Sequence, residues 1–475
     1  MSYAIHVGKD LTADGHAYLA GYGDEPSGHW LEIIPRERHG PGATIEVGAT
    51  AQAAMPGIRS TIPQVAETAR HLRVSYSSFL GLPGPLTNGG LNEYGVAVRD
   101  VWSPSSPRLR AMTPPDQSGP TYSDLARIVL ERATSAREGV ELIGRLIATH
   151  GETTYGGNSH LIADDTEAWV VIEFAGGQGL WVAERLGSDV VRVSRPGYIG
   201  EIPTDVVGHP DFMGSHHLVS FAVDHGWYAP DRGDAFDVDA IYGDGKGRWP
   251  GVAWIEDELT RRAAANDGLT LPDVLWALRT ERLTGDSAGY GQVVPLHPAG
   301  CPELRMLWHA PVGPIAAPFT PFFLGVRSVP PEFRQHRYLL QGEAAAFVDD
   351  SDATDLASAV PQRIEATRSA VAVFKRLLYL LAEHHELFLP EVTPVWEAFE
   401  REVATALAGV TAMAETLVSA GRLDLALDLV TRHCSTEALR SLDLGETMAD
   451  SMDARSRLLF GIREDRAWRG PRRLW

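Results

Sequence analysis

The chain has 475 residues, 44% of them hydrophobic and 22% charged, so it can bury a core larger than that of one small domain. Its 42 basic and 62 acidic residues give a net charge of −20, which disfavours binding to nucleic-acid phosphates and to anionic membrane surfaces. Cys301 and Cys434 are too few and too far apart for a disulfide framework or a thiolate metal site.

The sequence carries no segment that would direct it into or across a membrane. Its first residues lack the basic stretch and apolar run of a signal peptide, and no stretch approaches about 18 consecutive apolar residues. We therefore expect a soluble cytoplasmic protein. The sequence does not specify an oligomeric state, and a homo-oligomer is compatible with it.

The first elements along the chain are two short strands, predicted at residues 3–8 and 16–21. Asp14-Gly15 joins them, a pair favoured in tight hairpin turns. Ser2 precedes the first strand, which we expect to hold it at a sheet edge. If Met1 is removed, Ser2 carries both a hydroxyl and a free α-amine, whose reference pKa of about 7.7–8.0 suits a general base. Ser2 is therefore a candidate nucleophile, although a small second residue also occurs in many proteins without that role.

The region up to residue 200 combines strands with one pair of helices. Further strands are predicted at residues 30–34, 44–47, 94–98, 159–163, 167–173, 180–184 and 190–194. One helix begins at Tyr122, and a second opens at Ser135, with Glu138 three residues later as a capping box, and stops at Gly151. The run WVVI at 169–172 is apolar on both strand faces, which predicts a helix layer on one side and a second sheet on the other.

The second half of the chain changes character. Residues 208–340 are predicted to be rich in loops and contain aromatic and proline clusters such as APFTPFF at 317–323, whereas helical spacing of apolar residues begins at about Pro361. The adjacent pairs His216-His217 and His384-His385 do not converge from one helix face, as metal ligands would. We therefore expect neither a metal nor an organic cofactor.

Several segments occur in one order along the chain: VGKDLTADG at 7–15, IPQVAET at 62–68, GGLNEYGVAV at 89–98, DLARIVLERATSAREGVELIGRLIATHG at 124–151, ADDTEAWVVIE at 163–173, LWVAERL at 180–186 and HHLVSFAVDHGWYAP at 216–230. Their residues and order resemble the N-terminal-nucleophile dipeptidases of the dipeptidase A and secernin type. The resemblance implies an α+β fold, a four-layer αββα N-terminal-nucleophile hydrolase sandwich over residues 1–340. Residues 341–475 would then form a helical C-terminal extension.

The resemblance also implies a set of site residues. The nucleophilic cysteine of the family falls on Ser2, and a hydroxyl depends more than a thiol on its base and on oxyanion stabilisation. Asp24 would orient the terminal amine, and Asn92 would donate to the oxyanion. Gly21 stands where the family has an arginine. Arg195 stands where the family has an asparagine, and there it would bind a substrate carboxylate. Asp24 and Asn92 also suit ordinary turns, and Arg195 also suits a structural role.

The implied reaction is hydrolysis of a dipeptide amide bond through an acyl-enzyme on Ser2, with the α-amine as base and then as acid. Two alternatives stay open. The first is a specialised amidase or acyltransferase that acts on a small non-peptide molecule. The second is a catalytically inactive scaffold.

Overall fold

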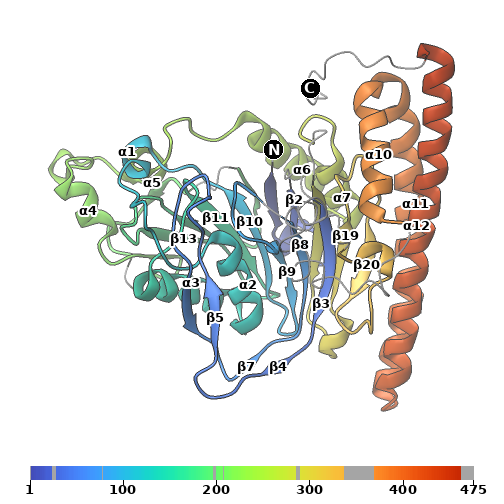
Figure 1. Cartoon of the computed structure of the whole chain (residues 1–475), viewed down its shortest axis with the longest axis horizontal. Helices are drawn as coiled ribbons and strands as arrows, with labels where there is room; N and C mark the ends of the chain where they lie inside the picture. The colour runs from blue at the N-terminus through green and yellow to red at the C-terminus, as the bar shows by residue number, and fades with distance from the viewer. Residues whose placement is uncertain are drawn as a thin grey trace, which may run out of the picture.

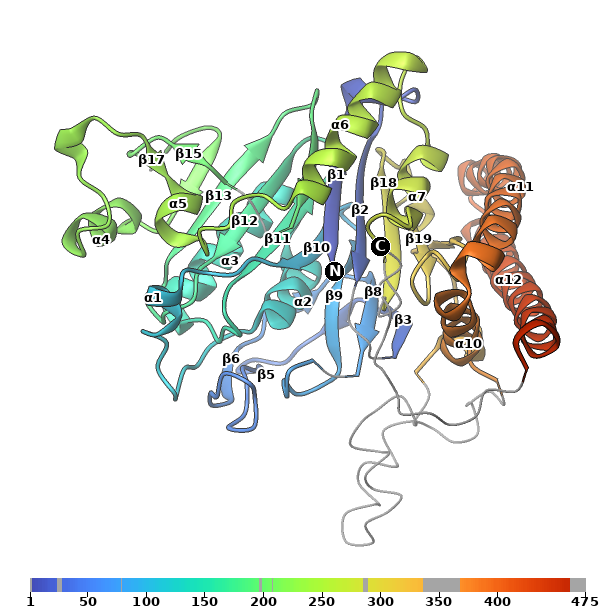
Figure 2. The same ribbon diagram turned by 90° about the horizontal axis from the view of Figure 1, so that it is seen from above.

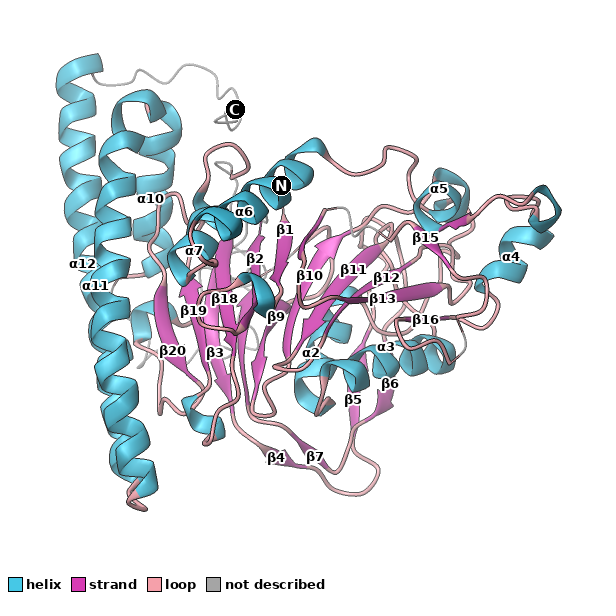
Figure 3. Cartoon of the chain, turned by 180° about the vertical axis from the view of Figure 1, so that it is seen from behind, coloured by secondary structure: helices cyan, strands magenta, loops and turns pink. Residues whose placement is uncertain are grey.

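Two antiparallel β-sheets lie face to face between helices (Figure 1). The structure is a computed structural model that describes residues 2–23, 28–77, 79–195, 199–206, 208–284, 289–335 and 368–461. Figure 3 shows the sheets from behind, with helices on their outer sides. The predicted αββα layering is therefore confirmed.

The first sheet has six strands and contains the N-terminal hairpin. Its order is β14 (Val191–Ser194), β1 (Tyr3–Val7), β2 (Ala17–Gly23), β18 (Tyr290–Leu296), β19 (Met306–Ala310) and β20 (Thr320–Phe323). The hairpin prediction is confirmed, because Tyr3 pairs with Tyr22 and Val7 with Tyr18. The edge position expected for Ser2 is wrong, because β14 pairs with the other side of β1 and makes β1 an inner strand.

The second sheet has eight strands. Its order is β16 (Phe212–Gly214), β13 (Trp181–Leu186), β12 (Ala168–Glu173), β11 (Asn158–Ala163), β10 (Ala97–Trp102), β9 (Leu86–Asn92), β8 (His71–Tyr76) and β3 (His29–Ile34). The strand expected at 94–98 begins later, at Ala97, and the glycine-rich stretch before it forms β9. Added Cβ atoms on Gly89 and Gly90 would lie 1.9 Å from the carbonyl oxygens of Val98 and Leu72, so this strand depends on glycine. Three small sheets pair β4 (Glu37–Arg38) with β7 (Glu67–Thr68), β5 (Thr44–Val47) with β6 (Ser60–Pro63), and β15 (Glu201–Ile202) with β17 (Phe236–Asp237).

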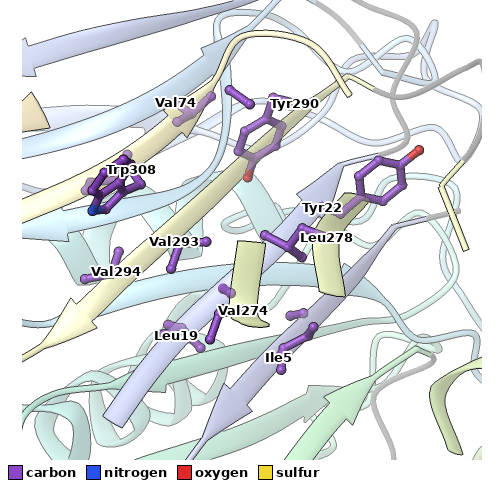
Figure 4. Packing of buried hydrophobic residues seen from close by; sticks show 14 of the residues in the cluster. Ile5, Leu19, Tyr22, Val74, Val274, Leu278, Tyr290, Val293, Val294 and Trp308 are labelled. Atoms are coloured by element: carbon purple, nitrogen blue, oxygen red, sulfur yellow. The ribbon is translucent and has the colours of Figure 1, made fainter. Parts of the chain in front are cut away.

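Helices cover the outer face of each large sheet. The eight-stranded sheet contacts α2 (Tyr122–Arg132) and α3 (Ala136–His150), and the six-stranded sheet contacts α6 (Pro250–Ala265) and α7 (Leu271–Arg279). Within β12, Trp169 and Val171 belong to the core under α2 and α3, whereas Val170 and Ile172 belong to the core between the sheets. The predicted two-sided burial of this strand is therefore confirmed. Figure 4 shows Ile5 and Tyr22 of the six-stranded sheet with Val274 and Leu278 of α7.

The start of α3 confirms half of the predicted capping box. The Ser135 hydroxyl accepts a hydrogen bond from the Glu138 backbone N–H at 3.2 Å, as predicted. The Glu138 carboxylate instead accepts from the backbone N–H of Thr134 at 2.8 Å. Gly151, at φ 77°, ends the helix as expected.

The region 208–340, predicted to be rich in loops, also contains regular elements. This region contains α4 (Leu218–Asp224), α5 (Val238–Tyr242), α6, α7, β18, β19 and β20, and so supplies half of the six-stranded sheet. Short helices complete the first 335 residues: α1 (Pro107–Arg110), η1 (Lys9–Leu11), η2 (Pro230–Arg232), η3 (Pro302–Leu304) and η4 (Pro331–Phe333). The sequence does not predict β18 and β20 because each contains a proline, which is uncommon inside a sheet.

The C-terminal part is helical, as expected. It contains α10 (Ala370–Glu383), α11 (His385–Ser419) and α12 (Leu423–Phe460), which lie together on one side of the sandwich (Figure 2), and α12 contacts β20. The boundary expected at 340/341 lies outside the described residues, so the two-part division stays a prediction. In the described ranges no helix has both the length and the apolar character needed to cross a bilayer.

Candidate active site

Ser2 lies at the beginning of β1, on the face of that strand that looks toward the eight-stranded sheet. Tyr3 points the other way, because its hydroxyl donates to the backbone carbonyl of Ala277 in α7 at 2.7 Å. Side chains alternate along a strand, so position 2 shares the inner face with Ala4. The side chain of Ser2 is thus directed into the space between the sheets.

The structure brings Arg195 to Ser2. Ala4 pairs with Ser194 at the end of β14, so the next residue along that strand comes level with the start of β1. Arg195 Nη1 donates to the Ser2 carbonyl oxygen at 2.8 Å, and its guanidinium carbon lies 5.5 Å from the ring centre of Trp249. A fixed positive charge therefore stands beside Ser2. Asp24, the predicted amine-orienting acid, lies outside the described residues.

The geometry of Asn92 contradicts its predicted role as an oxyanion donor. Its Nδ2 donates to the carbonyls of Leu130 at 3.2 Å and Ala133 at 2.8 Å, at the end of α2. Its Oδ1 accepts from the backbone N–H groups of Tyr94 and Val96, each at 3.0 Å. The amide is therefore used to close the β9–β10 turn and to hold α2, because a turn asparagine satisfies local backbone groups.

Asn92 also lies at the far end of the sandwich. Asn92 of β9 pairs with His71 at one end of β8, whereas Tyr76, at the other end of β8, pairs with His29 of β3. The His29 ring stacks on Tyr290 at 4.9 Å, and Tyr290 pairs with Gly23, next to the start of β1. The Ser2 end of the sandwich is therefore the end marked by His29 and Tyr76.

Asn88 is a residue that the sequence reasoning missed. It sits where the β8–β9 register shifts, and it is fully buried. Neither its Nδ2 nor its Oδ1 has a hydrogen-bond partner in the part of the chain that the structure describes. Buried side-chain amides are usually hydrogen-bonded, so Asn88 is a candidate site residue. The only sequence signal was an asparagine before two glycines, which reads as a turn.

Arg99 of β10 occupies the space beside Gly21. An added Cβ on Gly21 would lie 2.5 Å from Arg99 Cδ and Nε, so the glycine admits this side chain. Arg99 is fully buried, donates to the Tyr22 carbonyl at 3.0 Å, and forms an ion pair with Asp100 at 2.5 Å. The arginine expected at position 21 is absent, yet a guanidinium stands next to that position.

A second polar cluster lies on the other side of the eight-stranded sheet. His160 Nδ1 bonds to Glu173 Oε1 at 2.8 Å, and both residues are fully buried. Burial opposes charge on His160, but the Glu173 carboxylate outweighs it and raises the pKa of His160. Burial also raises the pKa of Glu173. The two residues share the helix-facing side with Val171, as does a pocket of about 810 Å³ beside α3. This cluster and pocket are therefore separated from Ser2 by the sheet.

No group of three or more His, Cys, Asp or Glu side chains within the described ranges is arranged to hold a metal ion. Arg195 contacts Ser2 directly, and Arg99 lies beside Gly21 on the strand next to Ser2. Both guanidinium groups are charged donors suited to anionic or carbonyl oxygens. The site therefore has the means to stabilise negative charge that develops on an oxygen.

Comparisons with known proteins agree with the resemblance seen in the sequence. Residues 74–248 match the family model described as Peptidase family C69. A 101-residue segment is 37% identical to the probable dipeptidase B of Lactococcus lactis subsp. lactis (strain IL1403), covering 21% of this chain and 20% of that protein. A 221-residue segment is 26% identical to the probable dipeptidase A of Streptococcus pyogenes serotype M3 (strain SSI-1), covering 46% of this chain and 44% of that protein. The matched segments thus span less than half of these relatives.

Two solved structures are also similar. Penicillin V acylase from Agrobacterium tumefaciens is 15% identical with a TM-score of 0.32, and the match covers 68% of this chain and 86% of that one. A variant of conjugated bile acid hydrolase from Clostridium perfringens is 11% identical with a TM-score of 0.36, and the match covers 68% of this chain and 92% of that one.

Proposed function

We propose that this chain, a relative of the dipeptidases of peptidase family C69, hydrolyses the amide bond of dipeptides through an acyl-enzyme on Ser2. The observation that carries the proposal is the position of Ser2. It begins an inner strand, faces the space between the sheets, and has its carbonyl held by Arg195. The matched family and the names of the curated relatives support the reaction class.

The proposed reaction begins once Met1 has been removed. The free α-amine takes the proton from Ser2 Oγ, and Oγ attacks the amide carbonyl to form a tetrahedral oxyanion. As the carbon–nitrogen bond breaks, the proton passes from the α-ammonium to the leaving amine. Water then attacks the acyl-enzyme, with the amine again as base, and releases the acid. Asp24 would orient the amine, as the resemblance implies.

Asn88 replaces Asn92 as the proposed oxyanion donor. Its buried amide uses neither of its polar atoms within the described protein, so a donor is available without breaking another bond. An amide donor of this kind stabilises the oxyanion more than the neutral carbonyl, which lowers the barrier.

Arg195 is the proposed partner of the substrate carboxylate. A guanidinium presents a planar fork that matches a carboxylate, and this one is fixed beside the nucleophile by its bond to the Ser2 carbonyl. We therefore expect free dipeptides to be preferred over dipeptide amides. Arg195→Asn should raise KM for the free acid more than for its amide, and equal effects on both would contradict this role.

The test of the nucleophile is intact-mass spectrometry of the protein before and after an activated ester probe. The mass should show that Met1 is absent and that one acyl group is added to the wild type, while Ser2→Ala gains none. Ser2→Cys is the matched control, because it keeps a nucleophile of similar size and should still be acylated. A retained Met1, or equal labelling of Ser2→Ala, would overturn the mechanism.

A second function, acyl transfer on a non-peptide substrate, is favoured by one observation. Gly21 stands where the family has an arginine, so the site differs beside the proposed nucleophile. Partitioning of the acyl-enzyme between water and hydroxylamine distinguishes the two reactions: a hydrolase gives mainly the acid. If the wild type forms no acyl-enzyme, the chain is a scaffold.

A further inference from the structure

We propose that Arg99 is a positioning residue for the N-terminal site. Its buried guanidinium, which Gly21 admits, tunes the α-amine of Ser2 and holds the end of β2 beside it. The inference rests on the proposed role of Ser2 as an N-terminal nucleophile.

The first step is the fit between Gly21 and Arg99. An ideal Cβ on Gly21 would lie 2.5 Å from Arg99 Cδ and Nε and 2.6 Å from Cγ. These are atoms of a fully buried side chain rather than the mobile end of an exposed one. Any other residue at position 21 would therefore displace the guanidinium. A strand glycine of this kind marks a close approach, here between a charged side chain of one sheet and the backbone of the other.

The Arg99 guanidinium is directed along β2 toward the Ser2 end of the strand. Gly21 pairs with Ala4 on β1, so Ala4 and Ser2 share the face on which Arg99 lies. Ser2 is two residues further along, roughly 7 Å at strand spacing. Arg99 Nη2 extends the same way, because it donates to the Tyr22 carbonyl at 3.0 Å. The positive end of the pair therefore approaches Ser2.

The third step is the carboxylate partner. Arg99 Nη1 bonds to Asp100 Oδ1 at 2.5 Å, and the Asp100 side chain is only 4% exposed. Adjacent residues of a strand cannot tie distant segments together, so this pair has little to do with joining the sheets. The Tyr22 contact, by contrast, crosses from β10 to β2. The pair therefore presents a dipole whose cation faces the N-terminal strand.

Several groups face this location from the surrounding elements. They are Arg195 after β14, Tyr290 from β18 and His29 from β3, and Asp100 is the ion-pair partner of Arg99 on β10. The Arg99 guanidinium carbon lies 5.2 Å from the Tyr290 ring centre. A cation at roughly 10 Å in protein surroundings shifts an amine by about one pH unit. Arg99 disfavours the ammonium form and so keeps the amine a free base at neutral pH.

The experiment measures the pH midpoint of Ser2 acylation in variants of the pair. Arg99→Met removes the cation and leaves Asp100, so the midpoint should move about one pH unit toward alkaline pH. Asp100→Asn leaves the cation unbalanced, so the midpoint should move the opposite way. Arg99→Lys keeps a charge and should stay nearer the wild type. A merely structural pair would change stability without opposite shifts, and equal midpoints in folded variants would overturn the proposal.

A rescue experiment covers the case in which Arg99→Met does not fold. The double variant Gly21→Arg with Arg99→Ala returns a guanidinium to the same space from β2, and it should recover a midpoint within a few tenths of a pH unit of the wild type. Gly21→Ala alone should displace Arg99 and move the midpoint toward alkaline pH. If wild-type Ser2 is not acylated, the proposed function fails. If it is acylated but the Gly21→Ala midpoint is unchanged, only the role of Arg99 fails.

Discussion

Arg99 and Arg279 are both buried and both form an ion pair with a buried carboxylate, but the partners differ in their distance along the chain. Arg279 lies at the end of α7 and forms a two-pronged ion pair with Glu400 of α11, with Nη1–Oε2 at 2.9 Å. Its Nε donates to the Pro314 carbonyl at 2.7 Å, and Glu400 accepts the Phe319 N–H at 2.8 Å. Every one of these bonds joins segments far apart in the chain. Arg99 instead pairs with its own neighbour, Asp100.

The difference shows that the distance along the chain between the partners separates the two roles. The Arg279 pair spans 121 residues and fixes the helical extension to the sandwich. The Arg99–Asp100 pair spans one residue, whereas the bond from Arg99 to the Tyr22 carbonyl joins β10 to β2 on the strand next to Ser2. We therefore expect changes at Arg279 to act on stability alone, and changes at Arg99, which also leave a buried carboxylate unpaired, to act on both stability and chemistry.

Removing Arg279 should have the largest effect. Arg279→Met leaves the Glu400 carboxylate buried without its cation, which costs roughly 3–5 kcal/mol of unfolding free energy. Denaturant unfolding measures that loss, and acylation per folded molecule should be unchanged. The matched control is Arg279→Met with Glu400→Leu, which should recover much of the stability because no lone charge remains. Equal losses in both variants would show that the ion pair is not the cause.

Replacing Asn88 should affect the acylation rate and leave stability intact, the opposite of the effects expected for Arg279. Asn88→Leu replaces an amide of similar size whose polar atoms have no partner among the described residues, so folding loses no hydrogen bond and stability should hold or rise. If the amide stabilises the oxyanion, the acylation rate should fall by about 10²–10³-fold. Single-turnover acylation measures the rate, and thermal unfolding measures stability. An unchanged rate would remove Asn88 from the site.

Much of the fold could be predicted because local patterns and tertiary structure agree. Asp14-Gly15 predicted the first hairpin, and WVVI at 169–172 predicted a strand covered on both faces. The pattern failed where tertiary packing overrides local preference. Gly89 and Gly90 suggest a turn but serve a central strand, because neighbouring backbones leave no room for Cβ atoms. Pro295 and Pro321 suggest loops but lie within β18 and β20.

The site was less predictable because its groups come from separate sheets. Ser2 and Arg195 could be named from the resemblance, and the structure brings them together. Asn92 was misassigned because both a turn and an oxyanion site use asparagine. Arg99 gave no signal, since its importance depends on an empty space beside Gly21. A residue missing from one strand and supplied by another is visible only when the strands are placed together.

His309 is a buried imidazole whose effect on stability should depend on pH. Burial lowers the pKa of His309 to about 3, and neither ring nitrogen has a hydrogen-bond partner within the described ranges. Between pH 6.5 and 3, roughly, the unfolded chain binds a proton that the folded protein does not, so stability falls as pH falls. His309→Leu removes this contribution. Between pH 7 and pH 5 the unfolding free energy of His309→Leu should fall by about 2 kcal/mol less than that of the wild type. Parallel pH–stability curves would contradict this assignment.

The smallest effect is expected at Ser135, remote from both arginines. Its hydroxyl accepts the Glu138 N–H at 3.2 Å and satisfies one of the otherwise unpaired N–H groups at the start of α3. Ser135→Ala should cost about 1 kcal/mol in urea unfolding, whereas Ser135→Asp keeps an acceptor and should cost little. The Glu138 carboxylate accepts from Thr134 and not from Ser135, so the two side chains share no hydrogen bond. The stability losses in Glu138→Gln and Ser135→Ala should therefore be independent. A loss near that of Arg279→Met would contradict the predicted ranking of these two contacts.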